Sequence, residues 1–117
     1  MAMTFVEERY HKVQAIKATW TSAADGTASG TTTAVDWDGQ VVMLCTVAGS
    51  DCPSDNYDVA VTDGDGVDIL CGKGADRDLT NTEYVVADMG AVSCSPLTFS
   101  VTNAGDTKGG TIYLRIV

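Results

Sequence analysis

The strongest constraint on the fold is a two-residue alternation of apolar and polar side chains near the end of the chain. In two segments every second residue is large and apolar: Leu97, Phe99, Val101, Ile112, Leu114 and Ile116. A period of two places successive side chains on opposite faces of a β-strand. The turn-forming stretch NAGDTKGG lies between the two segments. We therefore predict a terminal antiparallel hairpin.

The rest of the chain divides into short stretches of strand-forming residues separated by Gly, Asp, Asn and Ser, and no window sustains a helical period. The run QVVMLCTV (40–47) is almost entirely apolar, which predicts a central strand covered on both faces. Asp38-Gly39 predicts a hairpin turn between this run and a strand at 31–37. Further strands are expected at 57–63, 67–71 and 83–88.

About seven or eight short strands predict an all-β fold, either a single antiparallel β-sandwich or a small β-barrel. Residues 11–117 are expected to form this domain. Residues 1–10 (MAMTFVEERY) do not follow either period. We predict that they form an extended N-terminal arm that a partner orders.

The stretch TDGDGVD (62–68) places three carboxylates and two glycines in seven positions, which raises the question of a cation site. An EF-hand loop requires a glycine at its sixth position and a bidentate glutamate at its twelfth. Counted from Asp63, those positions hold Asp68 and Gly74. The match therefore fails at both.

The alternative for this stretch is a tight hairpin turn. If the apolar sets of both flanking strands face one core, Gly64, Asp65 and Gly66 form a three-residue loop with Gly66 in the left-handed conformation. The opposed pairs are then Asp63–Val67, Thr62–Asp68, Val61–Ile69 and Val59–Cys71. In this register the carboxylates diverge, so we favour a turn over a cation site.

The sequence offers few residues for catalysis. His11 is the single histidine, and neither GxSxG nor GxxxxGK[ST] is present. The pairs Asp36/Asp38 and Asp76/Asp78 have the residue types of glycoside hydrolysis, but Asp-rich loops more often serve turns. We predict that the chain is not an enzyme and has no catalytic residue, cofactor or metal ion.

The four cysteines stand at positions 45, 52, 71 and 94, without a CxxC pair. Free thiols that pack as small apolar groups are the favoured interpretation. One or two disulfides and a four-cysteine zinc site stay open as alternatives.

The formal net charge is −9, from 16 acidic and 7 basic side chains, and twelve of the acids lie between Asp36 and Asp88. Such a balance disfavours nucleic-acid binding, which depends on Lys and Arg contacts with phosphates. No apolar run approaches the length of a membrane span, and the first residues lack a signal-peptide pattern. We expect synthesis in the cytoplasm, with neither a membrane nor a nucleic acid as partner.

Three elements of the sequence form a distinctive set: the DNYDV–TD–DGVD hairpin and the GKGADRD loop in segment 53–83, and the PLT–V–NAGD–GT–L pattern in segment 95–117. Together these two segments resemble a group of small virion structural proteins of tailed bacteriophages. The resemblance implies a capsid decoration or cement protein on the virion surface, which binds the major capsid protein and forms a dimer or trimer. Alternatives are a neck, tail or spike component and, less favoured, a carbohydrate-binding domain. The residues predicted to contact a partner are Phe5, Val6, Tyr10 and Trp20.

Overall fold

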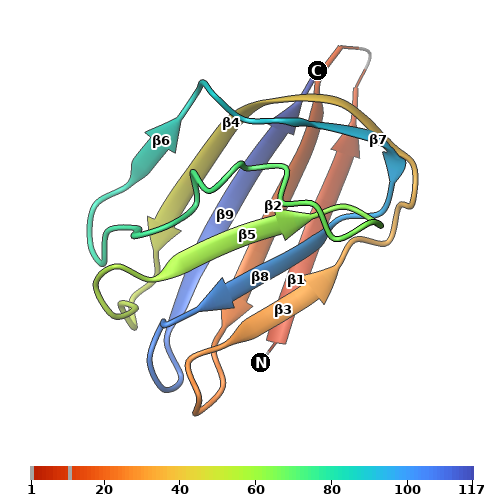
Figure 1. Cartoon of the computed structure of the whole chain (residues 1–117). Coiled ribbons are helices and arrows are strands. Elements are labelled where there is room, and N and C mark those ends of the chain that lie inside the picture. Colours follow the sequence, from red (N-terminus) through yellow and green to blue (C-terminus); the bar gives the residue numbers. More distant parts are fainter. Residues whose placement is uncertain (1, 11) are drawn as a thin grey trace.

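The computed structural model describes residues 2–10 and 12–117, and these residues form nine β-strands and no helix (Figure 1). The strands are β1 (Ala2–Arg9), β2 (Gln14–Thr21), β3 (Ala28–Thr31), β4 (Trp37–Ala48), β5 (Asp58–Thr62), β6 (Glu83–Val85), β7 (Ala91–Ser95), β8 (Thr98–Thr102) and β9 (Gly109–Ile116).

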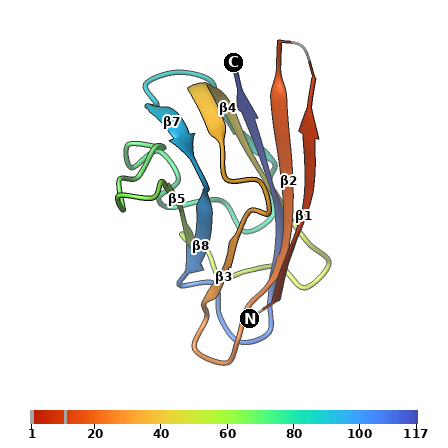
Figure 2. The ribbon, with the colours of Figure 1, turned by 90° about the vertical axis from the view of Figure 1, so that its right-hand side faces the viewer.

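The strands form two antiparallel sheets packed face to face as two layers (Figure 2). The large sheet has the order β1-β2-β9-β4-β6, with β7 paired to the first part of β4, and the small sheet has the order β3-β8-β5. The predicted all-β sandwich is therefore confirmed, and of the two predicted architectures the closed barrel is not the one that forms.

The core lies between the two sheets because each strand directs its alternating apolar side chains inward. From the large sheet these are Ile16, Ala18, Trp20, Leu44, Ile112, Leu114 and Ile116, and from the small sheet Ala28, Val59, Val61, Phe99 and Val101. All of them are at most 3% exposed. Burial of this apolar surface is the main favourable contribution to folding.

The predicted terminal hairpin is wrong in its pairing, although both strands form. β8 belongs to the small sheet and β9 to the large sheet, so the two strands face each other across the core. The connection 103–108 crosses from one layer to the other, with Asn103, Gly105 and Thr107 at positive φ. Alternation determines which face of a strand is buried, but it does not determine which strand lies beside it.

The predicted turn at Asp38-Gly39 is also wrong, because both residues lie inside β4. The register of β4 shifts at Gly39 against β7, and Gly39 has φ +129°. A Cβ at Gly39 would lie 2.5 Å from the Val117 carbonyl oxygen. The glycine thus permits a bulge beside the chain end. The expected strand at 31–37 is instead the end of β3 followed by a loop.

The segment expected to be an extended arm is β1, which pairs with β2 along all eight of its residues. Met3 and Phe5 pack against the core. The Glu7 carboxylate accepts hydrogen bonds from the Thr33 and Ala34 amides, both at 2.9 Å. The described residues of the arm are therefore part of the domain, and the expected boundary after residue 10 falls in the turn between β1 and β2.

Candidate functional site

The turn at 63–67 has the register predicted from its flanking strands. The Gly66 amide donates to the Asp63 carbonyl, and the Asp63 amide donates to the Val67 carbonyl, both at 3.0 Å. Gly66 has φ +82°, as the third residue of the Gly64–Asp65–Gly66 loop requires. Thr62 pairs with Asp68, and the Ile69 amide donates to the Val61 carbonyl at 2.8 Å.

The pairing ends after Ile69, so the predicted Val59–Cys71 pair is wrong. The Val59 amide donates to the Gly74 carbonyl instead, and Cys71 is an exposed turn residue with φ +53°. The Asp68 carboxylate accepts hydrogen bonds from the amides of Leu70 and Gly72, which turns the chain away from β5.

The Asp63 and Asp68 carboxylates accept hydrogen bonds from two separate sets of backbone amides and do not converge. Asp63 Oδ1 accepts from the amides of Asp65 and Val67, whereas Asp68 accepts from the amides of Val61, Leu70 and Gly72. Among residues 2–10 and 12–117, no group of three or more His, Cys, Asp or Glu side chains is arranged to hold a metal ion.

Three of the four carboxylates considered for hydrolysis are held in structural contacts. Asp36 forms an ion pair with Arg9, and Asp38 Oδ1 accepts a hydrogen bond from the Cys94 amide at 3.2 Å. Asp78 accepts from the amides of Asn81 and Thr80, and these bonds lower its pKa from 3.8 to about 2. His11, the other candidate for acid–base chemistry, lies outside the described residues.

Arg77, the cation of the GKGADRD loop, is 6% exposed. Its Nε donates to Thr46 Oγ1 at 3.0 Å and lies 3.5 Å from Glu83 Oε1, and its Nη1 donates to the Lys73 carbonyl at 3.1 Å. Arg77 therefore ties this loop to β4 and β6, and its charge does not face solvent.

Two of the predicted partner contacts, Trp20 and Phe5, pack against the protein's own core. Trp20 is 1% exposed and packs against Tyr57, with ring centroids 5.6 Å apart. Phe5 is half-buried against Phe99. Trp37, the other aromatic considered for a sugar ligand, is fully buried. Neither tryptophan offers an exposed ring to stack on a sugar, which removes the basis for a carbohydrate site.

Val6 and Tyr10, the other two predicted contacts, are 55% and 68% exposed. The Tyr10 hydroxyl donates to Glu8 Oε2 at 2.8 Å, and this hydrogen bond is the main cause of a raised Tyr10 pKa. Val6 is an outward residue of β1 and so belongs to the side of the large sheet that faces away from the core.

We call this side the outer face. The strand registers place its side chains in three rows that cross β1, β2, β9 and β4, of which the second continues onto β6. The hydroxyl row is Thr4, Thr19, Thr111 and Val47; the aromatic row is Val6, Lys17, Tyr113, Cys45 and Tyr84; and the charged row is Glu8, Ala15, Arg115 and Met43.

The outer face differs in charge from the rest of the molecule. Glu8 is the only carboxylate in the three rows, whereas the chain has 16 acidic side chains. Lys17 and Arg115 bring two cations to the same face. The Lys17 ammonium lies over the Tyr113 ring, 5.9 Å from its centroid. A protein with a net charge of −9 therefore presents one face that is nearly free of carboxylates.

The aromatic and charged rows enclose two hollows on either side of Tyr113 and Arg115. The larger, about 370 Å³, is lined by Met43, Cys45, Val47, Thr82, Tyr84, Tyr113 and Arg115. The smaller, about 100 Å³, is bounded by Val6, Glu8 and Lys17 on its other side. Tyr84 is 66% exposed at the margin of the larger hollow. Aromatic side chains and a guanidinium around an apolar hollow are typical of protein-binding surfaces.

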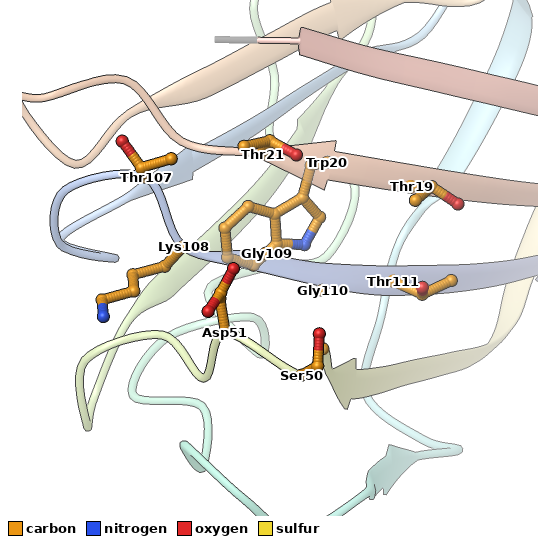
Figure 3. Close-up of a pocket in the computed structure, with 11 residues that line it drawn as sticks. Thr19, Trp20, Thr21, Ser50, Asp51, Thr107, Lys108, Gly109, Gly110 and Thr111 are labelled. Atoms are coloured by element: carbon orange, nitrogen blue, oxygen red, sulfur yellow. The ribbon is translucent and has the colours of Figure 1, made fainter.

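The hydroxyl row leads to a third hollow of about 250 Å³ at the end of β2 and the beginning of β9 (Figure 3). Hydroxyl groups of Thr19, Thr21, Ser50, Thr107 and Thr111 line it, together with Asp51 and Lys108. Its floor includes Gly110, where a Cβ would lie 2.8 Å from the Val47 carbonyl oxygen and 2.9 Å from the Trp20 ring. The glycine is thus required by close packing, and the hollow forms the polar end of the outer face.

All four cysteines are free, but only Cys45 is buried; Cys52, Cys71 and Cys94 are exposed. Burial raises the pKa of the Cys45 thiol. The interpretation as free thiols is therefore confirmed, and that as buried apolar groups holds for one cysteine in four.

Sequence reasoning missed Tyr84, Tyr113, Arg115 and Met43. The sequence does contain a pattern that indicates Tyr113 and Arg115. The outward positions of β8 hold Thr98, Ser100 and Thr102, whereas the equivalent positions of β9 include Tyr113 and Arg115. Large side chains on the solvent side of a strand indicate a surface that makes contacts.

Comparison of the sequence with models of protein families gives no match, and comparison with curated proteins gives no match either. In the described part of the chain, no helix is long and apolar enough to cross a membrane.

Proposed function

We propose that this protein is a bacteriophage virion structural protein that decorates and stabilises the capsid shell, bound through its outer face. The sequence resemblance of segments 53–83 and 95–117 to small virion proteins supports the assignment to a phage particle. The observation that carries the binding role is the outer face, where Val6 and Tyr84 of the aromatic row are exposed and Glu8 is the only carboxylate in the three rows.

The chemistry of the outer face suits a folded protein as partner. Tyr and Arg are the side chains that most often dominate interface energies, because they combine a large apolar area with directed hydrogen bonds. The hollow between Tyr84 and Tyr113 accepts an apolar side chain of the partner, and Arg115 at its margin pairs with a carboxylate beside that side chain.

The remaining surface supports the same role. Acidic side chains are concentrated in β5 and its adjoining loops, from Asp55 to Asp78. A negative surface directed away from the shell repels nucleic acid and other acidic particles. A protein that binds the folded shell also stabilises it by mass action, because it does not bind dissociated subunits equally well.

Binding is tested by co-sedimentation of the purified protein with expanded capsid shells of the phage that encodes it. We expect the double variant Tyr84→Ser/Arg115→Glu to bind at least about tenfold more weakly, which corresponds to about 1.4 kcal/mol. The matched control is Val67→Ser/Lys73→Glu, which also removes an exposed apolar side chain and reverses a charge, outside the outer face. Equal binding of both double variants would refute the outer face as the shell contact.

The copy number in purified virions separates decoration from a neck, tail or spike role. A decoration protein follows the symmetry of the whole shell, so quantitative mass spectrometry should find it in numbers comparable with the major capsid protein. About five to twelve copies per particle would instead indicate a ring at the neck or tail.

A further inference from the structure

Among residues 2–10 and 12–117, no strand pairs with the outer edge of β1, so this edge of the large sheet is open. β1 pairs with β2 on one side, and it ends the order of strands in that sheet. Figure 2 looks onto this edge of the sandwich, where β1 and β3 lie. β3 contacts β1 through side chains, since a Cβ at Gly30 would lie 3.0 Å from the Phe5 ring and 3.1 Å from Met3 Cβ.

The ladder shows which backbone groups point to the open edge. The Tyr10 amide donates to the Val13 carbonyl at 3.1 Å, so this pair is a hydrogen-bonded pair of the antiparallel ladder. Hydrogen-bonded pairs alternate along such a ladder, and even-numbered residues of β1 therefore bond to β2. The amides and carbonyls of Met3, Phe5, Glu7 and Arg9 point away from β2.

β1 has charged residues only in its second half (Glu7, Glu8 and Arg9) and lacks the other features that usually protect an edge strand. It has eight residues, whereas the other strands at sheet margins, β3, β5, β6 and β7, have three to five. It contains no proline and no lysine, and its pairing with β2 has no register shift. Natural proteins usually shorten, charge or bend an edge of this length, because an unprotected edge pairs with another strand.

We propose that two copies of this protein pair β1 with β1 in antiparallel orientation about a two-fold axis at Val6. This register opposes Phe5 with Glu7 and Met3 with Arg9, so all four residues with open backbone groups bond to one another. About eight hydrogen bonds result, two for each of four hydrogen-bonded pairs. Each odd-numbered residue of β1 opposes an odd-numbered residue of the other copy, so inward side chains lie opposite inward side chains. Both cores therefore lie on the same side of the joined sheet.

When two copies pair through β1, charge favours the antiparallel orientation over the parallel one. The charged residues of β1 (Glu7, Glu8 and Arg9) are all in its second half. Antiparallel pairing sets them opposite Phe5, Thr4 and Met3, whereas parallel pairing in register would set each glutamate opposite its own copy. The axis brings two Val6 side chains together, which covers a residue that is 55% exposed. The two outer faces then join into one continuous surface.

The dimer goes beyond the proposed function and needs no shell to form, so it is measured on the purified protein by sedimentation equilibrium. We expect the wild type to be a dimer of the 12.2 kDa chain and Val6→Lys to be a monomer with an unchanged circular dichroism spectrum. Val67→Lys is the matched control, because Val67 is 57% exposed and lies outside β1, and it should stay a dimer.

Cross-linking tests the register. In a background with Cys52, Cys71 and Cys94 replaced by Ser, Val6→Cys should form a disulfide-linked dimer on oxidation, because non-hydrogen-bonded pairs have Cα atoms about 4.5 Å apart. Thr4→Cys should not form this disulfide, because residue 4 of one copy opposes residue 8 of the other, and the two copies of residue 4 are far apart.

A monomeric wild type, a dimeric Val6→Lys variant, or equal cross-linking at residues 4 and 6 would each refute the proposal. The shell-binding variant Tyr84→Ser/Arg115→Glu should stay a dimer, which keeps failure of this proposal distinct from failure of the proposed function.

Discussion

Phe5 meets Phe99 edge to face, with ring centroids 5.4 Å apart and the ring planes at 62°. The contact joins β1 of the large sheet to β8 of the small sheet, across residues far apart in the sequence. It shows why the first strand belongs to the domain, since its inward side chains close one edge of the sandwich. Edge-to-face pairs of this kind add about 0.5 to 1.5 kcal/mol to the burial of the rings.

The first prediction concerns this contact. Phe5→Ala should lower the free energy of unfolding by about 2 to 3 kcal/mol, somewhat less than for a fully buried phenylalanine, because Phe5 is half-buried. Thr4→Ala, an exposed neighbour on the same strand, should change it by less than about 0.5 kcal/mol. Urea unfolding measures both. Equal stabilities of the two variants would mean that β1 does not contribute to the core.

The second prediction compares two glycines that both have positive φ. Gly39→Ala should destabilise the protein by about 2 to 4 kcal/mol, because the new methyl group would lie 2.5 Å from the Val117 carbonyl oxygen. Gly72 has φ +80° and no atom within 4 Å of an added Cβ, so Gly72→Ala should cost only about 1 to 2 kcal/mol of backbone strain. Thermal or urea unfolding measures both variants, and the difference between them gives the cost of the steric clash at Gly39 beyond the backbone strain. A larger loss for Gly72→Ala would show that the bulge at Gly39 is wrongly placed.

The third prediction concerns thiol reactivity. Cys52, Cys71 and Cys94 are exposed and should be alkylated rapidly by iodoacetamide at pH 8. Cys45 is 5% exposed, and burial raises its thiol pKa. We expect it to be alkylated about tenfold more slowly or slower still, because less of it is thiolate and iodoacetamide reaches it less easily. Mass spectrometry of the digested protein gives the rate at each position. In urea all four should react alike, and fast alkylation of Cys45 in the folded protein would contradict its burial beside Tyr84.

The fourth prediction concerns pH. Hydrogen bonds from the Asn81 and Thr80 amides hold the pKa of Asp78 at about 2, below its ordinary 3.8. A carboxylate with a depressed folded-state pKa contributes stability that is present above the unfolded pKa and is lost as pH falls through the folded pKa. The difference in urea midpoint between wild type and Asp78→Ala should therefore be constant above about pH 5 and shrink between pH 4 and 2. A difference that stays constant down to pH 2 would show that the carboxylate charge has no part in it.

Local sequence patterns predicted where strands and turns form better than they predicted which strands pair. The alternation at 97–102 and 112–117 identified both strands and their buried faces, and the parity argument at TDGDGVD predicted the turn and the left-handed Gly66. These features depend on residues within a few positions of one another. The β8–β9 pairing, the Asp38-Gly39 turn and the separate arm were wrong because each depends on a contact with a distant segment.

The candidate site also combines features that local patterns predict with features that depend on contacts between distant segments. Side-chain alternation and turn chemistry are local, so they were enough to predict that the chain forms strands, which faces of the last two strands are apolar, and how the acidic loop turns. Three other features became known from the folded structure: Trp20 is buried, β1 lies at a sheet edge, and one row is formed by Val6, Lys17, Tyr113, Cys45 and Tyr84. The row brings together residues from five strands, and strand order is set by packing across the whole core rather than by any local pattern.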